Sequence, residues 1–164
     1  MRSAFPAAFA ATAVLLAPAA HAAAKASAVE VVQPWSRPAA VGTNGAGFMT
    51  LTNHGKAPET LMSVETPAAT QAQMHQTSMA GGIMSMKRLD AGLALAPGQT
   101  VTFAPGGYHL MLIGLTKALN AGDKVPATLV FASGARIKIA FLVGSGPQAP
   151  GAMPMDMPMD HMRH

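Results

Sequence analysis

His109, Leu110 and Met111 form a triplet that can supply two metal donors from a single strand. Successive side chains of a strand point to opposite faces, so the imidazole of His109 and the thioether of Met111 would project together. Leu110 would point the other way, into a hydrophobic core. Such a triplet also occurs by chance, and methionine is a common core residue, so a metal site needs further donors elsewhere in the chain.

The segment between His75 and Met86 can supply those donors as a β-hairpin. We expect a turn centred on Ala80-Gly81, which would place His75 directly opposite Met86, with β-carbons about 5 Å apart. A slip in the pairing would bring in Met74 or Met84 instead. Met84 lies on the same strand face as Met86 and is the reserve ligand.

Two imidazoles and two thioethers form a donor set suited to copper(I). Thioethers are soft ligands that select copper(I), and imidazole binds copper in either oxidation state. Calcium and magnesium prefer oxygen ligands, and no carboxylate cluster accompanies these residues. The chain contains no cysteine, which excludes thiolate zinc sites, thiol catalysis and blue-copper electron transfer. We therefore expect a site that binds, protects and releases copper(I), and no enzymatic activity.

The elements that must position these residues are short strands. Apolar and polar residues alternate in segments such as Gly47–Asn53, and glycine or proline turns separate the segments. This spacing is typical of an all-β sandwich or barrel. Residues 93–95 lead into a turn, and no long helix is indicated. We predict strands over residues 29–32, 47–53, 59–64, 70–77, 83–89, 99–103, 108–113, 125–132 and 135–143.

Residues 1–22 have the layout of a secretory signal peptide. Arg2 gives a positive start to an apolar run from Ala7 to Ala20, and Ala20-His21-Ala22 is a small-x-small cleavage site. The apolar run is shorter than the ~20 residues that a membrane span needs. We expect cleavage after Ala22, export to the periplasm of a Gram-negative type of bacterium, and no membrane span in the mature chain.

Residues 23–146 form the predicted copper-binding domain, and residues 147–164 a disordered tail rich in methionine and histidine. The tail has no core periodicity. Its donors predict an additional region that binds copper(I) or copper(II), more weakly than the domain because ordering the tail costs entropy. These donors are Met153, Met155, Met157, Met159, His161, Met162 and His164.

The charge of the chain argues against a nucleic-acid partner. The formal net charge is +4, and the loss of Arg2 with the signal peptide would leave +4 − 1 = +3. The basic residues are mostly scattered singly, and aromatic residues are few. A nucleic-acid surface would need a clustered basic stripe with stacking rings.

The order and spacing of the four donors resemble those of the periplasmic copper(I) chaperones of the PCu(A)C family. Ten residues separate His75 from Met86, and twenty-two precede His109, one more than the family's usual interval. The resemblance covers residues 29–143 and includes the block PGGYHLMLIGL at residues 105–115. It implies a cupredoxin-like Greek-key β-sandwich that holds copper near the surface, at the mouth of the sandwich.

The resemblance also implies a role. Family members deliver copper towards the dinuclear copper centre of cytochrome c oxidase, often with a thioredoxin-fold partner. We therefore expect a monomer that passes copper(I) to the oxidase copper subunit or to a thioredoxin-fold assembly factor. A periplasmic storage or resistance buffer without a specific delivery partner is the alternative. A copper enzyme and a β-sandwich adhesion module with incidental methionines are less favoured.

Overall fold

The computed structural model describes residues 27–146, which form ten β-strands and no helix. The predicted signal peptide and the predicted tail, with its Met and His donors, lie outside the described residues. Every predicted strand is present, and Leu93–Leu95, expected to lead into a turn, is itself a strand. The strands are β1 (Val29–Ser36), β2 (Gly45–Asn53), β3 (Glu59–Glu65), β4 (Ala69–Ala80), β5 (Ile83–Arg88), β6 (Leu93–Leu95), β7 (Thr100–Phe103), β8 (Tyr108–Leu115), β9 (Lys124–Phe131) and β10 (Arg136–Val143).

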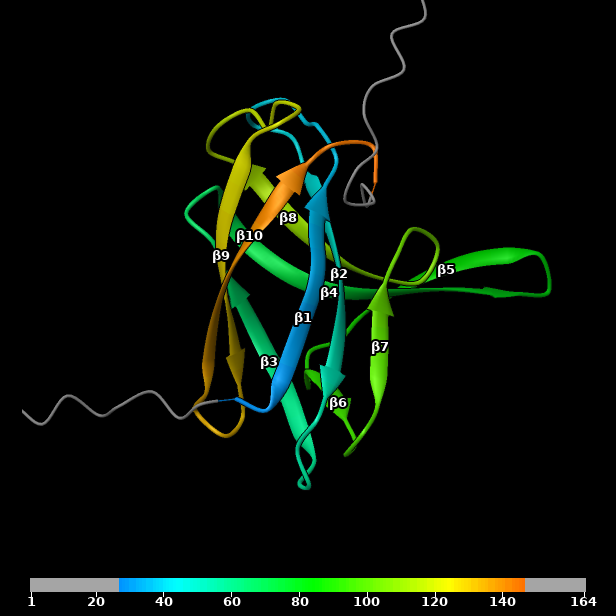
Figure 1. Ribbon diagram of the computed structural model, residues 1–164. Coiled ribbons are helices and arrows are strands. Elements are labelled where there is room, and N and C mark those ends of the chain that lie inside the picture. Colours follow the sequence, from blue (N-terminus) through cyan, green and yellow to red (C-terminus); the bar gives the residue numbers. More distant parts are fainter. Residues whose placement is uncertain (1–26, 147–164) are drawn as a thin grey trace, which may run out of the picture.

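The strands form one continuous hydrogen-bonded sheet that curls back on itself (Figure 1). Its order is β5-β4-β8-β7-β2-β1-β10-β9-β3-β6, with a further pairing of β8 to β2. Leu110 of β8 clusters with Phe141 of β10 and Leu129 of β9, two strands that do not pair with β8, because the curled sheet packs one part of its inner face against another. The predicted all-β sandwich is confirmed. Within residues 27–146, no helix is long and apolar enough to cross a membrane.

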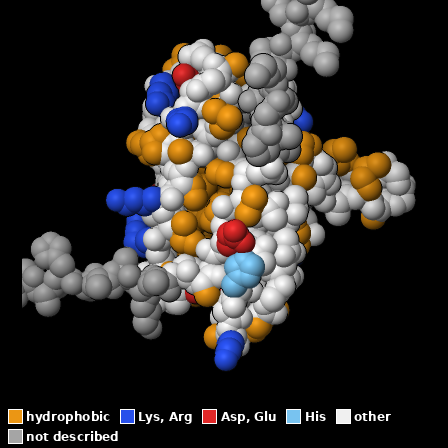
Figure 2. Space-filling model, viewed as in Figure 1, with side chains coloured by type: hydrophobic (Ala, Val, Ile, Leu, Met, Phe, Trp, Pro, Cys, Tyr) orange, Lys and Arg blue, Asp and Glu red, His pale blue; other side chains and the backbone are white. Residues whose placement is uncertain are grey.

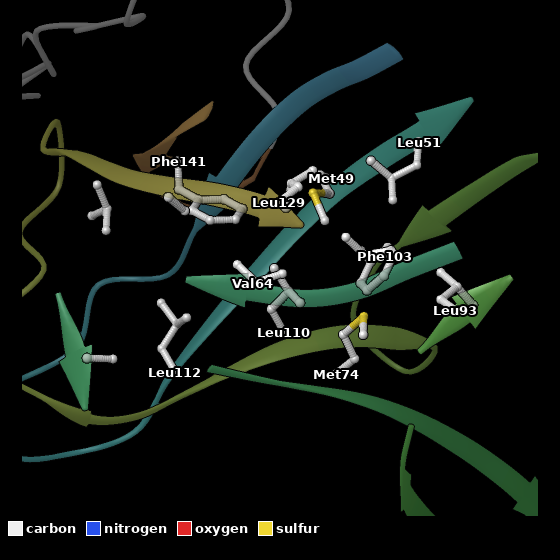
Figure 3. Close-up of a cluster of buried hydrophobic side chains, with 14 of the residues drawn as sticks. Met49, Leu51, Val64, Met74, Leu93, Phe103, Leu110, Leu112, Leu129 and Phe141 are labelled. Carbon is white, nitrogen blue, oxygen red and sulfur yellow. The ribbon is translucent and has the colours of Figure 1, made fainter. Parts of the chain in front are cut away.

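The hydrophobic core fixes which residues of β4 and β8 face outward. Leu110 and Leu112 of β8 are fully buried, and they pack in one cluster with Phe141 and Leu129 from the other part of the sheet (Figure 3). Met74 of β4 lies opposite Leu110 and belongs to the same cluster. Burying each such side chain contributes about 1.5–3 kcal/mol. The residues that alternate with these, on the other face of β4 and β8, are left to form a surface.

The hairpin of β4 and β5 projects beyond the rest of the sheet (Figure 1). Gln76 of β4 pairs with Tyr108, the first residue of β8, so beyond Thr77 the strand β4 pairs with β5 alone. Every residue of β5 is exposed. The base of the hairpin is therefore held by the core, and its outer half is reached by solvent from both faces.

The hairpin turns at Gly81-Gly82 and not at the predicted Ala80-Gly81. Both glycines have a positive φ, 59° and 78°, as the two central residues of a type I′ turn require. His75 therefore pairs with Arg88, and the predicted pairing of His75 with Met86 is wrong. The error moves each partner by two residues, which is one full side-chain period, so Met86 keeps its predicted face.

Candidate metal centre

His75 and His109 are directly opposed partners on β4 and β8. The centroids of their rings are 5.6 Å apart, and the ring planes meet at 37°. A metal–imidazole bond is about 2 Å long and a ring nitrogen lies ~1 Å from its centroid, so two rings that share an ion have centroids within about 6 Å of each other. The two imidazoles are thus close enough to bind one metal ion.

Met86 and Met111 lie on the same face as the two imidazoles, one on each side of them. Met111 follows His109 by two residues on β8, and Met86 precedes Arg88, the partner of His75, by two residues on β5. Each methionine is therefore a diagonal neighbour of His75, with β-carbons about 7 Å apart, a gap that long side chains span. The structure brings the four predicted donors to one surface.

The surface that carries the four donors is less exposed to solvent at His109 than at Met86 on the projecting hairpin. His109 is only 9% exposed, His75 and Met111 are half-buried, and Met86 on the projecting hairpin is 53% exposed. An ion between the imidazoles would therefore lie near the protein surface, and Met86 is the donor that solvent and other molecules reach most easily.

Hydrogen bonds leave a different nitrogen of each imidazole free to bind a metal ion. The side-chain oxygen of Gln73 accepts a hydrogen bond from Nε2 of His75 at 3.0 Å, while the Gln73 amide NH₂ donates to Gln71. Nε2 of His75 therefore carries the proton, and Nδ1 has the lone pair. In His109, Nδ1 donates to the carbonyl oxygen of Gly107 at 3.3 Å, which leaves the lone pair on Nε2.

Nδ1 of His75 is a buried atom without a hydrogen-bond partner in the described structure. Buried nitrogen and oxygen atoms are almost always paired, so an exception needs an explanation. A metal ion bound to this lone pair would satisfy it. The unpaired atom, beside a second imidazole and two thioethers, fits a soft monovalent cation such as copper(I).

Residues 27–146 contain no group of three or more histidine, aspartate or glutamate side chains that could hold a metal ion. The described residues thus offer no cluster of carboxylates or of three imidazoles as an alternative site. The donors at the His75–His109 pair are neutral nitrogen and sulfur atoms, which favour copper(I) over calcium, magnesium or zinc.

Other predicted donors lie farther from the imidazole pair. Met84, the reserve ligand, pairs with Met79 on the outer half of the hairpin, two residues beyond Met86. Met74, the alternative in a slipped register, is 5% exposed and lies in the core. The seven tail donors are outside the described residues.

Sequence reasoning missed Gln73 and Arg88, which lie on the same face of the sheet as the four predicted donors. The signal was available in part, because Gln73 precedes His75 by two residues on a predicted strand and must share its face. Arg88 lies opposite His75, as the corrected turn requires, and its side chain forms an ion pair with Asp90.

The surroundings of His75 lower its pKa from the ordinary value of 6.5. Desolvation by burial is the largest cause, the nearby charges of His109 and Arg88 add to it, and Asp90 acts in the opposite direction. A lowered pKa keeps the imidazole neutral, and therefore able to bind a metal, in mildly acidic solution.

Residues 29–143 match the family described as "Putative lipoprotein LpqE-like". Among individual proteins, "Putative lipoprotein Lxx21020" of Leifsonia xyli subsp. xyli (strain CTCB07) is 33% identical over 116 residues, which make up 71% of this chain and 69% of that protein. The family match, over residues 29–143, spans all ten strands and includes both histidine strands.

Solved structures match the fold as well. The copper-bound PCuAC domain from PmoF2 superposes with a TM-score of 0.60 at 28% identity, over 71% of this chain and 92% of that domain. The solution structure of CuI-DR1885 from Deinococcus radiodurans gives a TM-score of 0.56 at 30% identity, over 76% of this chain and 82% of that one. These matches confirm the cupredoxin-like class of the fold.

The two histidines should carry opposite tautomers in the metal-free chain. We expect nitrogen-15 spectra of the imidazole rings to show a protonated Nε2 in His75 and a protonated Nδ1 in His109, because of their bonds to Gln73 and Gly107. Gln73→Leu should weaken copper(I) binding by about tenfold, since partners that orient a ligand contribute about that much. Gln71→Leu is the control, because Gln71 contacts Gln73 and not His75, and it should have a smaller effect. A protonated Nδ1 in His75 would contradict the assignment.

The pKa of His75 should respond in opposite directions to its two charged neighbours. In the metal-free chain, we expect Arg88→Gln to raise this pKa and Asp90→Asn to lower it further, as followed by the ring-proton shifts of His75 over a pH titration. Because the folded-state pKa lies below 6.5, the unfolded chain binds more protons between the two values. The contribution of His75 to stability is therefore present above pH 6.5 and is lost as the pH falls through its folded-state pKa. Shifts of the same sign in both variants would contradict this account.

Proposed function

Since the chain belongs to the LpqE-like family and has the fold of its PCu(A)C copper-binding domains, we propose that it is an exported copper(I) chaperone. In this proposal, His75, Met86, His109 and Met111 bind one copper(I) ion, and the protein catalyses no reaction. Copper is its cargo, taken up from one molecule and passed to another.

The observation that carries this proposal is the His75–His109 pair with its unpaired buried nitrogen. The rings are within sharing distance, the free lone pairs are Nδ1 of His75 and Nε2 of His109, and thioethers flank both. Two neutral nitrogens and two neutral sulfurs leave the site with a single positive charge when copper(I) is bound. This limits the electrostatic cost of holding the ion at a half-buried position.

The same donors suit a carrier because they can be displaced one at a time. Neutral imidazole and thioether bind copper(I) less tightly than thiolates do, and Met86 is exposed to an incoming ligand. The absence of cysteine also means that an oxidising compartment cannot inactivate the site by forming a disulfide. This supports a place of action outside the cytoplasm, which we propose to be the periplasm.

The proposed recipient is the copper subunit that holds the dinuclear centre of cytochrome c oxidase, or a thioredoxin-fold assembly factor. The tail over residues 147–164 would bind additional copper through its methionines and histidines. A storage or resistance buffer would use the same ligands without a specific recipient, so only a transfer measurement separates the two roles.

One equivalent of copper(I), added without oxygen to the full chain, should shift the ring signals of His75 and His109 together with the methyl signals of Met86 and Met111. Residue-resolved NMR separates these from signals of the tail. His75→Ala should weaken binding at this site by more than about tenfold, because it removes a direct ligand and not merely a supporting group.

Met74→Leu is the matched control, because Met74 is adjacent to His75 on β4 but lies on the core face. A methionine-to-leucine exchange conserves core volume and is usually tolerated, so copper(I) affinity should be unchanged. Methyl signals of Met86 and Met111 that stay unmoved while the histidines respond would rule out the four-ligand site.

The delivery role predicts direct transfer. Copper(I)-loaded chain mixed with a metal-free dinuclear-copper domain of cytochrome c oxidase should load that domain faster than the same proteins separated by a dialysis membrane, since ligand exchange needs contact. A thioredoxin-fold assembly factor can be tested as recipient in the same way. Equal rates with and without contact for both recipients would favour the storage buffer.

A further inference from the structure

Three exposed methionines line one face of the projecting hairpin. Met79 and Met84 are directly opposed partners, and Met86 lies two residues from Met84 on the same face. Met79 is 68% exposed and Met84 is 67% exposed, so neither side chain fills the core. Figure 2 shows hydrophobic side chains gathered on this hairpin, well away from the body of the molecule.

The sulfur atoms are confined to one of the two hairpin faces. The opposite face carries Ser78 paired with Ser85, their hydroxyls 3.0 Å apart, and Ala80 paired with Ile83. Both faces of the outer hairpin are exposed, so burial does not explain why methionine occupies only one. The face with methionine is the one that carries His75 and His109.

Along this face, donors follow one another from the tip to the imidazoles. Met79 and Met84 form the outermost pair, Met86 comes next, and His75 follows opposite Arg88. Opposed residues have β-carbons about 5 Å apart and diagonal neighbours about 7 Å, distances that flexible thioether side chains can bridge. Each donor is therefore within reach of the next.

We propose that Met79, Met84 and Met86 form a second copper(I) site, which captures the ion at the hairpin tip before it reaches the histidines. The proposal rests on the function proposed above, because it supplies the entry step of that carrier. Thioethers alone are soft, neutral and weakly bound ligands, so this site would accept copper(I) and release it readily.

Met86 belongs to both sites and links them. An ion held by Met79, Met84 and Met86 moves inward when a histidine nitrogen forms a bond to it and the bonds to Met79 and Met84 break. Met86 remains bound throughout. Copper stays in the +1 state, and the imidazoles involved already have free lone pairs, so the step transfers neither an electron nor a proton.

The tip site is tested by its own signals in the full chain. Silver(I), a soft monovalent ion that does not change oxidation state, should shift the methyl signals of Met79 and Met84 when a second equivalent is added. In His75→Ala, His109→Ala these methyl signals should respond to the first equivalent instead. Methyl signals of Met79 and Met84 that do not move in either protein would overturn the proposal.

The entry role is tested by the rate of loading. Met79→Leu, Met84→Leu should slow the transfer of copper(I) from a small thioether complex to the histidines by about tenfold, because capture at the tip raises the local concentration of the ion. The final affinity of the histidine site should be unchanged. An unchanged loading rate would overturn the entry role.

The matched control moves the methionine pair to the other face of the hairpin. Adding Ala80→Met and Ile83→Met to the double leucine variant restores two opposed thioethers at the tip, but on the opposite face. This variant should load as slowly as the double leucine variant, and recovery of the fast rate would overturn the proposal. Histidine signals that never respond to copper(I), while the tip methyl signals do, would instead defeat the function proposed above.

Discussion

The antiparallel pairing of β4 with β8 is the constraint on which the candidate site depends. It pairs His75 with His109 and the adjacent residue Met74 with Leu110. The second pair is buried in the core, which resists any slip of one strand past the other by a single residue, since such a slip would expose apolar side chains and bury imidazoles. The geometry of the metal site is therefore maintained by the packing of the opposite face.

The electrostatic character of the site follows from this half-buried position. Burial is the main reason that the pKa of His75 is lowered, so the ring stays neutral and its lone pair remains available. Gln73 and the carbonyl oxygen of Gly107 then determine which nitrogen of each ring is free. A buried nitrogen without a partner is unfavourable in the empty chain, and binding of an ion removes that cost.

The hairpin shows why its face was predictable and its register was not. Side chains of a strand alternate between two faces with a period of two. A change of turn that shifts the strand pairing by two residues therefore leaves His75 and Met86 on the same face. The register depends on whether Ala80-Gly81 or Gly81-Gly82 occupies the turn. Two adjacent residues with positive φ favour the glycine pair, so the information was present in the sequence, but it had to be weighed against a turn one residue earlier.

The sequence by itself determined the strands, the absence of thiol chemistry, the soft character of the donors and the surface that each donor shares with its strand neighbours, because these depend on residue type and local periodicity. Only the tertiary structure decided that β4 lies beside β8, that His75 meets His109, and that Nδ1 of His75 is left unpaired. The burial of Met74 with Leu110 and the rest of the core brings together two strands that are distant in the sequence. Local residue patterns do not determine which distant strands pack against each other, because that choice depends on non-local contacts.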